Sequence, residues 1–323
     1  MAFTSDTLFA EITTRTQEML TAEIYARVSH IPMLSHYTNV EAFGSMLRSR
    51  ELWFSSVRDM NDTSEAIEGF QLACKALEHH GHLIFENYGK LDVDQQFRAR
   101  QSLLETDTHV LSLCEHGSDR QTDRLPMWQA YGKDGNGICL VLSKNTLLGQ
   151  SARNRGFPVN WCPVEYDDEA QFSERVRSRL LLIKQAIAGT PGAEMHIPLP
   201  TLGMLIAAST VPLVLGHKNL GFEHEKEVRF IRSRLVQSLV PPEGAGYRIV
   251  TTGNVPRTKF ILPLRKYPEF DVDASLPALL DHIIIGPSDA QQEMTRVVRS
   301  LLDQNDLGHV RIVQSSIPYR PSK

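Results

Sequence analysis

Cysteine is scarce in this chain of 323 residues. The four cysteines are widely separated, and no two of them form a C-x-x-C pair; they are Cys74, Cys114, Cys139 and Cys162. Small disulfide-stapled folds and zinc modules need denser cysteine patterns, so the sequence argues against both classes. We therefore expect reduced thiols in a cytoplasmic protein.

Long apolar runs and a strong charge of either sign are also missing. No stretch of about 18 consecutive apolar residues occurs, so we predict no membrane span. Asp6 and Glu11 interrupt the N-terminal region, which argues against a signal peptide. The formal net charge of -4 gives no general electrostatic reason to bind nucleic acid or an anionic membrane.

Two nucleotide-binding signatures are absent as well. The sequence contains neither G-x-G-x-x-G nor G-x-x-x-x-G-K-[ST], so it carries neither a Rossmann fingerprint nor a P-loop. We also find no internal repeat and no low-complexity segment. The chain must therefore be interpreted from its local patterns.

What is present is a globular composition, with 41% hydrophobic and 22% charged residues. Apolar residues recur at helical spacing over residues 5–29, and we predict an N-terminal helical extension over residues 1–30. Residues 31–323 are expected to form a single α+β domain, because predicted strands and helices mix without strict alternation. The other predicted helices cover residues 40–49, 63–76, 93–105, 125–131, 169–188, 201–215 and 288–303. The predicted strands cover residues 33–38, 52–56, 108–114, 138–142, 161–166, 225–231, 247–250, 259–263, 282–287 and 310–313.

One short stretch, from Glu225 to Ile231, carries the strongest chemical signal. Side chains alternate between the two faces of a strand, so Glu225, Glu227 and Arg229 are predicted to share one face. Paired carboxylates can stabilise a developing positive charge or act as acid and base. The alternative is a solvated edge strand, in which charges discourage edge pairing. Arg229 is then either an ion-pair partner that orders the acids or a phosphate contact.

A second candidate group, His36, Tyr37 and Thr38, ends the first predicted strand. An imidazole and a hydroxyl close together can hold ribose hydroxyls or an amide. Alternatively, Thr38 is only the N-cap of the next helix, since Thr38 to Glu41 matches the capping-box pattern, and His36 is a satisfied core residue.

Aromatic and acidic residues add further candidates. Trp128 and Tyr131 lie three residues apart on a short predicted helix and could stack on a ligand ring. Core packing is the better explanation for Trp128, and Tyr131 is the better site candidate. Asp62 and Glu65 could join the two later acids in a hard-cation site, or they could simply cap a helix.

Taken together, these pieces resemble a bacterial family catalogued as domain of unknown function 2971. The resemblance runs from about residue 33 to Arg320. The matching pieces, in chain order, are His36-Tyr37-Thr38, Leu52-Trp53-Phe54-Ser55, Met60-Asn61-Asp62 with Glu65, Leu111-Ser112-Leu113-Cys114, Trp128-x-x-Tyr131-Gly132, Gly137-Ile138-Cys139-Leu140, Glu225-Lys226-Glu227-Val228-Arg229 and Ser316-Ile317-Pro318-Tyr319-Arg320. The family name carries no function.

A weaker resemblance is to the ADP-ribosyltransferase superfamily. In that superfamily a strand carrying His and a following Thr or Ser leads into a helix and a second strand, and a glutamate at the start of a later strand completes the site. His36, Thr38 and Glu227 match these positions. The resemblance implies an ADP-ribosyltransferase-like α+β fold with a mixed, split β-sheet core and surrounding helices.

The E-x-E at Glu225 and Glu227 looks like the arginine-modifying branch of that superfamily. The S-T-S signature of the branch is matched only in part by Ser55-Ser56-Val57, so the acceptor is not identified. The resemblance implies that NAD is the substrate and that its nicotinamide–ribose bond is cleaved. Glu227 would stabilise the oxocarbenium-like transition state, and Glu225 would orient or deprotonate the acceptor.

The same resemblance implies roles for the remaining candidates. His36 and Thr38 would hold a ribose, and Tyr37 and Tyr131 would flank the rings. Ser55 or Arg229 would fix phosphate or the neighbouring carboxylate. A toxin or phage-defence effector with a macromolecular acceptor is the implied setting, without a membrane partner, and a homo-oligomer remains open.

Two other functions stay open. A metal-dependent phosphodiesterase or nuclease would use Asp62, Glu65, Glu225 and Glu227, and it needs these acids within coordination distance. A non-catalytic sensor would bind a nucleotide in the same cleft. The enzymatic hypothesis requires no metal, and it requires that His36 and Glu227 face each other across one cleft.

Overall fold

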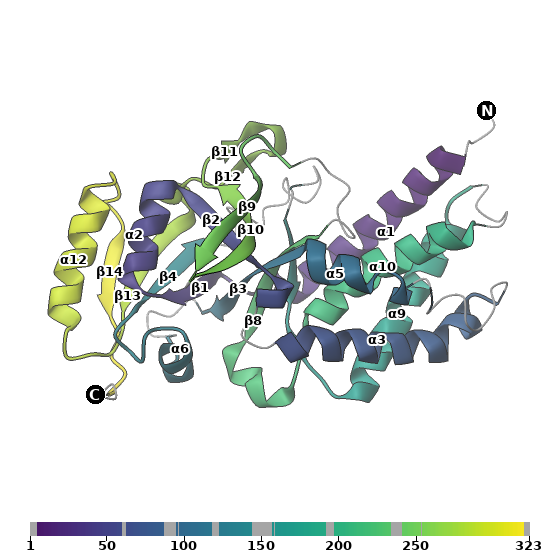
Figure 1. Cartoon of the computed structure of the whole chain (residues 1–323), viewed down its shortest axis with the longest axis horizontal. Coiled ribbons are helices and arrows are strands. Elements are labelled where there is room, and N and C mark those ends of the chain that lie inside the picture. The colour runs from purple at the N-terminus through teal and green to yellow at the C-terminus, as the bar shows by residue number, and fades with distance from the viewer. Residues whose placement is uncertain are drawn as a thin grey trace.

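The structure is a computed structural model that describes residues 5–59, 63–86, 95, 97–117, 123–143, 157, 159–191, 197–233, 241–252 and 254–319. It is an α+β protein built on a large mixed sheet (Figure 1). The described helices are α1 (Ser5–Val28), α2 (Val40–Ser49), α3 (Thr63–Ile84), α5 (Gln101–Asp107), α6 (Leu125–Ala130), α9 (Glu169–Ala188), α10 (Leu199–Leu215), α11 (Leu276–Leu279) and α12 (Gln291–Asp303), with short 3₁₀ turns η1 (Val57–Asp59), η2 (Leu220–Glu225) and η3 (Pro268–Phe270).

The strands form one main sheet and two small pairs. The strands are β1 (Met33–Thr38), β2 (Glu51–Ser56), β3 (Thr108–His116), β4 (Ile138–Ser143), β5 (Asn160–Pro163), β6 (Glu165–Tyr166), β7 (His217–Lys218), β8 (Glu227–Ser233), β9 (Gly246–Thr252), β10 (Val255–Pro263), β11 (Lys266–Tyr267), β12 (Val272–Asp273), β13 (Leu280–Ile285) and β14 (Arg311–Gln314). The main sheet runs in the order β14-β13-β4-β1-β3-β2-β10-β9, and β8 joins it through β3 and carries β5. It is mixed, because β13 and β14 pair in parallel whereas the other described pairs in this sheet are antiparallel.

The sheet divides at β3. Strand β8 pairs along one edge of β3 from Thr108 to Cys114. On the opposite edge, β2 pairs only with the start of β3, at His109 and Val110, and β1 pairs only with its end, from Cys114 to His116. Strands β1 and β2 therefore diverge on either side of the middle of β3. Ser112 lies in this gap and is the one exposed residue of β3.

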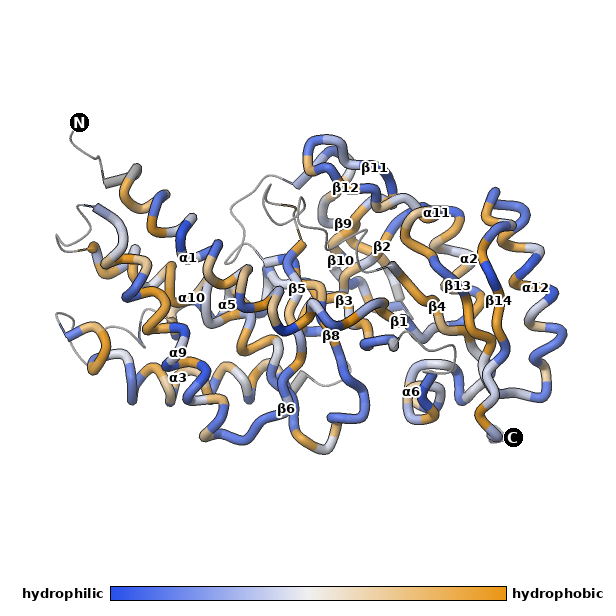
Figure 2. Tube along the Cα trace, turned by 180° about the vertical axis from the view of Figure 1, so that it is seen from behind, coloured by the Kyte–Doolittle hydropathy of each residue, from blue (hydrophilic) through white to orange (hydrophobic). Residues whose placement is uncertain are grey.

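The helices pack at both ends of the sheet (Figure 1). Helices α1, α3, α9 and α10 contact one another and form a helical bundle at one end. Helix α10 is apolar on all sides and buried over most of its length, which is typical of a helix in the centre of a bundle (Figure 2). At the other end, α12 places Val298 and Leu302 against the sheet core. No helix among the residues that the structure describes is long and apolar enough to cross a membrane.

Helix α1 confirms the helix predicted over residues 5–29. Its residue Ile12 belongs to the core of the helical bundle, and Val28 belongs to the core of the main sheet. The helix therefore packs into both cores. The proposed division at residue 30 stays a prediction.

Several predicted bounds change for local reasons. Helix α3 runs to Ile84, two turns beyond the predicted end. Asn39, and not Thr38, caps α2, because its side chain accepts a hydrogen bond from the Ala42 N–H at 2.8 Å. The strand predicted over residues 161–166 is two short strands, β5 and β6.

The central acidic stretch also differs from the prediction. Glu225 ends η2, and Lys226 adopts a left-handed conformation with φ of 44°, so β8 begins only at Glu227. Strand β8 is buried throughout and paired on both edges, and the edge-strand interpretation is therefore wrong. The turn at Lys226 nevertheless keeps both acids beside each other.

Candidate functional site

A cavity of about 490 Å³ lies at the split of the sheet. Seven of the eight predicted site residues line it: His36, Tyr37, Ser55, Tyr131, Glu225, Glu227 and Arg229. The eighth, Thr38, lines an adjoining cavity of about 340 Å³. The cavity therefore brings together an imidazole from β1 and carboxylates from the region of β8, about two hundred residues later in the chain.

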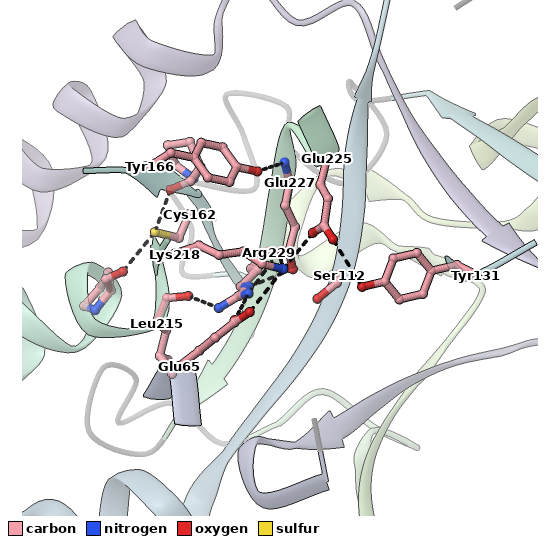
Figure 3. A network of polar contacts seen from close by, with 12 residues as sticks. Glu65, Ser112, Tyr131, Cys162, Tyr166, Leu215, Lys218, Glu225, Glu227 and Arg229 are labelled. Carbon is pink, nitrogen blue, oxygen red and sulfur yellow. Dashed lines mark hydrogen bonds and ion pairs between the residues drawn. The ribbon is translucent and has the colours of Figure 1, made fainter. Parts of the chain in front are cut away.

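Lys218 lies at the centre of the charged wall of this cavity (Figure 3). Its Nζ is 2.6 Å from Glu225 Oε2, 3.2 Å from Glu65 Oε1 and 3.3 Å from Glu227 Oε2. The ammonium group also lies 4.8 Å from the ring centroid of Phe222, a cation–π contact. Three carboxylates thus converge on one buried ammonium group.

Arg229 supplies the second cation. Its Nε and Nη2 donate to the two oxygens of Glu227 at 2.7 and 2.9 Å, and Nη2 also donates to Glu65 at 2.7 Å. Nη1 donates to the Leu215 carbonyl at 2.6 Å. Protein groups therefore engage all three nitrogens of this guanidinium group, as the ion-pair role requires (Figure 3). We call Glu65, Lys218, Glu225, Glu227 and Arg229 the ion cluster.

The ion cluster is buried, and its opposite charges favour the ionised forms of Glu227 and Lys218. Burial alone would raise the pKa of Glu227, but the opposite charges of Arg229 and Lys218 outweigh it and lower the pKa to about 2. Burial opposes the charge of Lys218 too, yet the surrounding carboxylates raise its pKa above the ordinary value. With three carboxyl and two basic side chains, the cluster has a formal net charge of -1.

The two acids of the E-x-E differ in what their oxygens contact. Glu227 accepts hydrogen bonds from Arg229, Lys218 and Ser112, so its oxygens are engaged within the protein. Glu225 binds Lys218 through Oε2, whereas Oε1 faces the Tyr131 hydroxyl at the long distance of 3.5 Å. Glu225 is therefore the acid with an oxygen turned toward the space beside Tyr131 (Figure 3).

His36 stands on the opposite side of the split. Its Nδ1 lies 3.3 Å from the Ser112 carbonyl, in the gap between β1 and β2 along the edge of β3 opposite β8. Burial lowers the pKa of His36, and the carbonyl offsets this only partly, so the neutral imidazole is favoured at neutral pH. The ring is half-buried and lines the cavity.

The aromatic candidates separate into core and rim. Trp128 is fully buried, as expected for core packing, and donates from Nε1 to Asp123 at 2.8 Å. Tyr37 packs edge-on against it, with ring centroids 4.9 Å apart, and its hydroxyl accepts from the Arg124 N–H. Tyr131 is 38% exposed at the rim, and burial together with Glu225 raises its pKa to about 12.

Ser55, from β2, also lines the cavity and accepts a hydrogen bond from Lys259 Nζ at 2.9 Å. The neighbouring Asp59 lines the same cavity and forms an ion pair with Arg257 at 3.1 Å. Ser55 and Asp59 therefore form a second polar part of the cavity wall, apart from the ion cluster.

Three of the four acids that the metal-dependent hypothesis requires surround a lysine side chain of the protein itself. Glu65, Glu225 and Glu227 converge on the Lys218 ammonium group, which occupies the position that a metal ion would need. Asp62 lies outside the described residues. No group of three metal-ligating side chains suited to a metal ion occurs among the residues that the structure describes.

Sequence reasoning missed four residues that build the site. Lys218 is the centre of the ion cluster, and Ser112 connects Glu227 to His36. Tyr166 accepts the Glu227 backbone N–H, and Arg124 donates to the Glu225 carbonyl. Only Lys218 leaves a clear signal, because it is the first Lys or Arg after Lys184 and it follows a long apolar helix.

Comparison with known proteins gives a family-model match to part of the chain and no named function. The searches of curated proteins and of solved structures gave no significant match. The ADP-ribosyltransferase resemblance therefore remains a prediction. The family model described as "Protein of unknown function (DUF2971)" matches residues 127–230, a segment that runs from α6 into β8 and contains Tyr131, Lys218 and the E-x-E.

Proposed function

We propose that the chain binds NAD in the cavity at the split of the sheet and cleaves its nicotinamide–ribose bond. ADP-ribose would pass to a macromolecular acceptor or to water. One observation carries the proposal: the two acids of the E-x-E and His36 line a single cavity. Its volume of about 490 Å³ falls in the usual range of small-molecule sites.

The electrostatics suit this chemistry. Cleavage of an N-glycosidic bond builds positive charge on the ribose, as in glycoside hydrolysis. The ion cluster has a formal net charge of -1, and the pKa of Glu227 near 2 keeps that acid ionised at neutral pH. A fixed anion in a water-poor site stabilises the transition state more than the ground state.

The two acids of the E-x-E would have different roles. Glu227 is fixed by Arg229 and Lys218, and it supplies the negative field behind the reacting sugar. Glu225, with one oxygen turned toward Tyr131, would contact the ribose or the attacking hydroxyl. His36, neutral at neutral pH, would hold a ribose hydroxyl from the other side of the split.

Release of nicotinamide from NAD tests the proposal directly. Wild-type protein should release nicotinamide, and Glu225→Gln and Glu227→Gln should each reduce the rate by roughly a hundredfold or more, since one such group contributes about 3–4 kcal/mol to transition-state stabilisation. Glu223→Gln is the matched control, because Glu223 lies on η2 two residues before Glu225 and is exposed. Thermal unfolding of each variant shows whether it is folded.

No nicotinamide release by folded wild-type protein, with a panel of protein and nucleic acid acceptors present, would contradict the proposal. Near-normal turnover by Glu227→Gln would remove that residue from its role. NAD depletion in bacteria that express the chain tests the toxin or phage-defence setting, which rests on the resemblance alone.

A second candidate is a sensor that binds NAD without cleaving it. The ion pairs of Glu227 favour this alternative, because a carboxylate whose lone pairs are engaged is less available to a substrate. The same assay separates the two functions. Saturable NAD binding by calorimetry with no released nicotinamide would identify the sensor.

A further inference from the structure

The second cavity, of about 340 Å³, differs sharply in chemistry from the one at the ion cluster. Its walls are mostly apolar side chains from α2, β2, β3 and β4, including Phe43, Met46, Leu140 and Leu142. A few hydroxyl groups, such as that of Thr38, interrupt the apolar surface. Apolar walls with a small number of polar groups are typical of sites for small organic ligands.

The two cavities adjoin each other. His36, Trp53, Leu111 and Leu113 line both. A ligand in the charged cavity can therefore extend past Trp53 into the apolar one. The pair of cavities suits a molecule with one polar end and one uncharged, ring-bearing end.

Trp53 forms the shared wall and is held in a fixed orientation. Its indole is 43% exposed, and Nε1 donates to Glu51 Oε2 at 2.9 Å. Arg248, from β9, holds the same carboxylate with two hydrogen bonds of 3.0 and 2.9 Å. An exposed indole that is fixed in this way is preorganised to stack on a flat ring.

Charge decides which ring fits. Among the residues that the structure describes, Glu51 is the only acidic or basic side chain other than His36 that lines the apolar cavity, and Arg248 neutralises it. A charged ring would lose hydration there without gaining an opposite charge. An uncharged, flat ring with hydrogen-bonding edges would bury its faces and meet the hydroxyl groups at its rim.

We propose that this apolar cavity is a subsite for an uncharged purine-type ring, with Trp53 as its stacking wall. The inference rests on the proposed function, because it assigns the second end of the same dinucleotide. It sets the orientation of the substrate: the uncharged base lies beside α2, and the positively charged nicotinamide ring lies toward the ion cluster.

Adenosine is the probe, since it carries the uncharged base and lacks the bond that would be cleaved. Calorimetry or ligand-observed NMR should detect adenosine binding to the full chain. Trp53→Ala should weaken it about fivefold or more, as expected when base–aromatic stacking is lost. Ala42→Trp should abolish detectable binding, because Ala42 lies on the exposed rim of the cavity and the larger side chain would fill it.

Glu41→Trp is the matched control. Glu41 neighbours Ala42 on α2, is exposed and does not line the cavity, so the same side chain there should leave the affinity unchanged. Equal affinity of wild type and Ala42→Trp, or no adenosine binding by wild type, would overturn the inference. A loss of binding in Glu41→Trp equal to that in Ala42→Trp would also overturn it.

An incorrect subsite and an incorrect cleavage activity would give different experimental results. Nicotinamide release without adenosine binding would leave the cleavage activity and remove the subsite. Adenosine binding that responds to Ala42→Trp, in a protein that releases no nicotinamide, would leave the subsite and remove the cleavage activity.

Discussion

The ion cluster and the ion pairs on the outer helices have similar distances but opposite environments. Arg229 meets Glu227 at 2.7 Å with both side chains more than nine-tenths buried. On α9, Arg177 meets Glu174 at the same 2.7 Å, with the two side chains 46% and 60% exposed. Distance alone therefore does not measure the importance of an ion pair, because water competes at the second site and not at the first.

Removing a cation from each site gives the largest expected difference. Arg229→Met should destabilise the fold by about 3–5 kcal/mol. Without Arg229, the three buried acids of the ion cluster would share a single cation, Lys218. Arg177→Met, on the surface of α9, should change the free energy of unfolding by less than about 0.5 kcal/mol. Urea unfolding of both variants measures the contrast, and equal effects would show that burial is not the cause.

The buried ion pairs of Glu227 also predict that the free energy of unfolding depends on pH. The pKa of Glu227 is about 2 in the folded protein, against an ordinary value of 4.5. The unfolded chain therefore takes up this proton first as the pH falls. The stabilisation from Glu227 is complete above pH 4.5 and is lost as the pH approaches 2.

Denaturation of wild type and Glu227→Gln over this range isolates that contribution. The difference in free energy of unfolding between the two proteins should be constant near neutral pH. Below pH 4.5 the wild type should lose stability relative to Glu227→Gln. A difference that stays constant down to pH 3 would mean that Glu227 is not held ionised by its neighbours. A surface acid such as Glu174, changed to Gln, provides the reference.

The smallest effect is expected at the rim of the ion cluster. Tyr131→Phe removes a hydroxyl group that lies 3.5 Å from Glu225, on a residue that is 38% exposed. The free energy of unfolding should fall by less than about 1 kcal/mol. A larger loss in urea unfolding would place Tyr131 inside the cluster and not on its rim.

The sequence predicts much of the fold because local patterns determine it. Helix α9 matches its predicted bounds because Asp168 and Gln171 form a capping box at its start. Helix α10 and strand β4 are recognisable because nearly every side chain in them is apolar. The strand–helix–strand ending of β13, α12 and β14 follows from the same patterns.

The site is harder to predict, because its residues depend on pairings between distant segments. The alternation of side chains along a strand predicts that Glu225, Glu227 and Arg229 lie on one face. In the structure, Glu225 precedes the strand, and a left-handed turn at Lys226 places it beside Glu227. The approach of β1 to β3, which places His36 over Ser112, leaves no trace in either local pattern. Lys218 does stand out in the sequence as a lone cation after a long apolar helix, but its role becomes visible only when three acids from other elements surround it.

Ser112 connects the two sides of the divided sheet. Its hydroxyl hydrogen-bonds Glu227, and its carbonyl lies against the His36 ring. A single residue thus contacts both the anion and the imidazole. Any coupling through Ser112 is reciprocal: a ligand that shifts the His36 titration on binding must change in affinity by the same factor when the ring is protonated. We therefore expect an NMR titration of His36, with and without ligand, to measure such coupling without any substrate turnover.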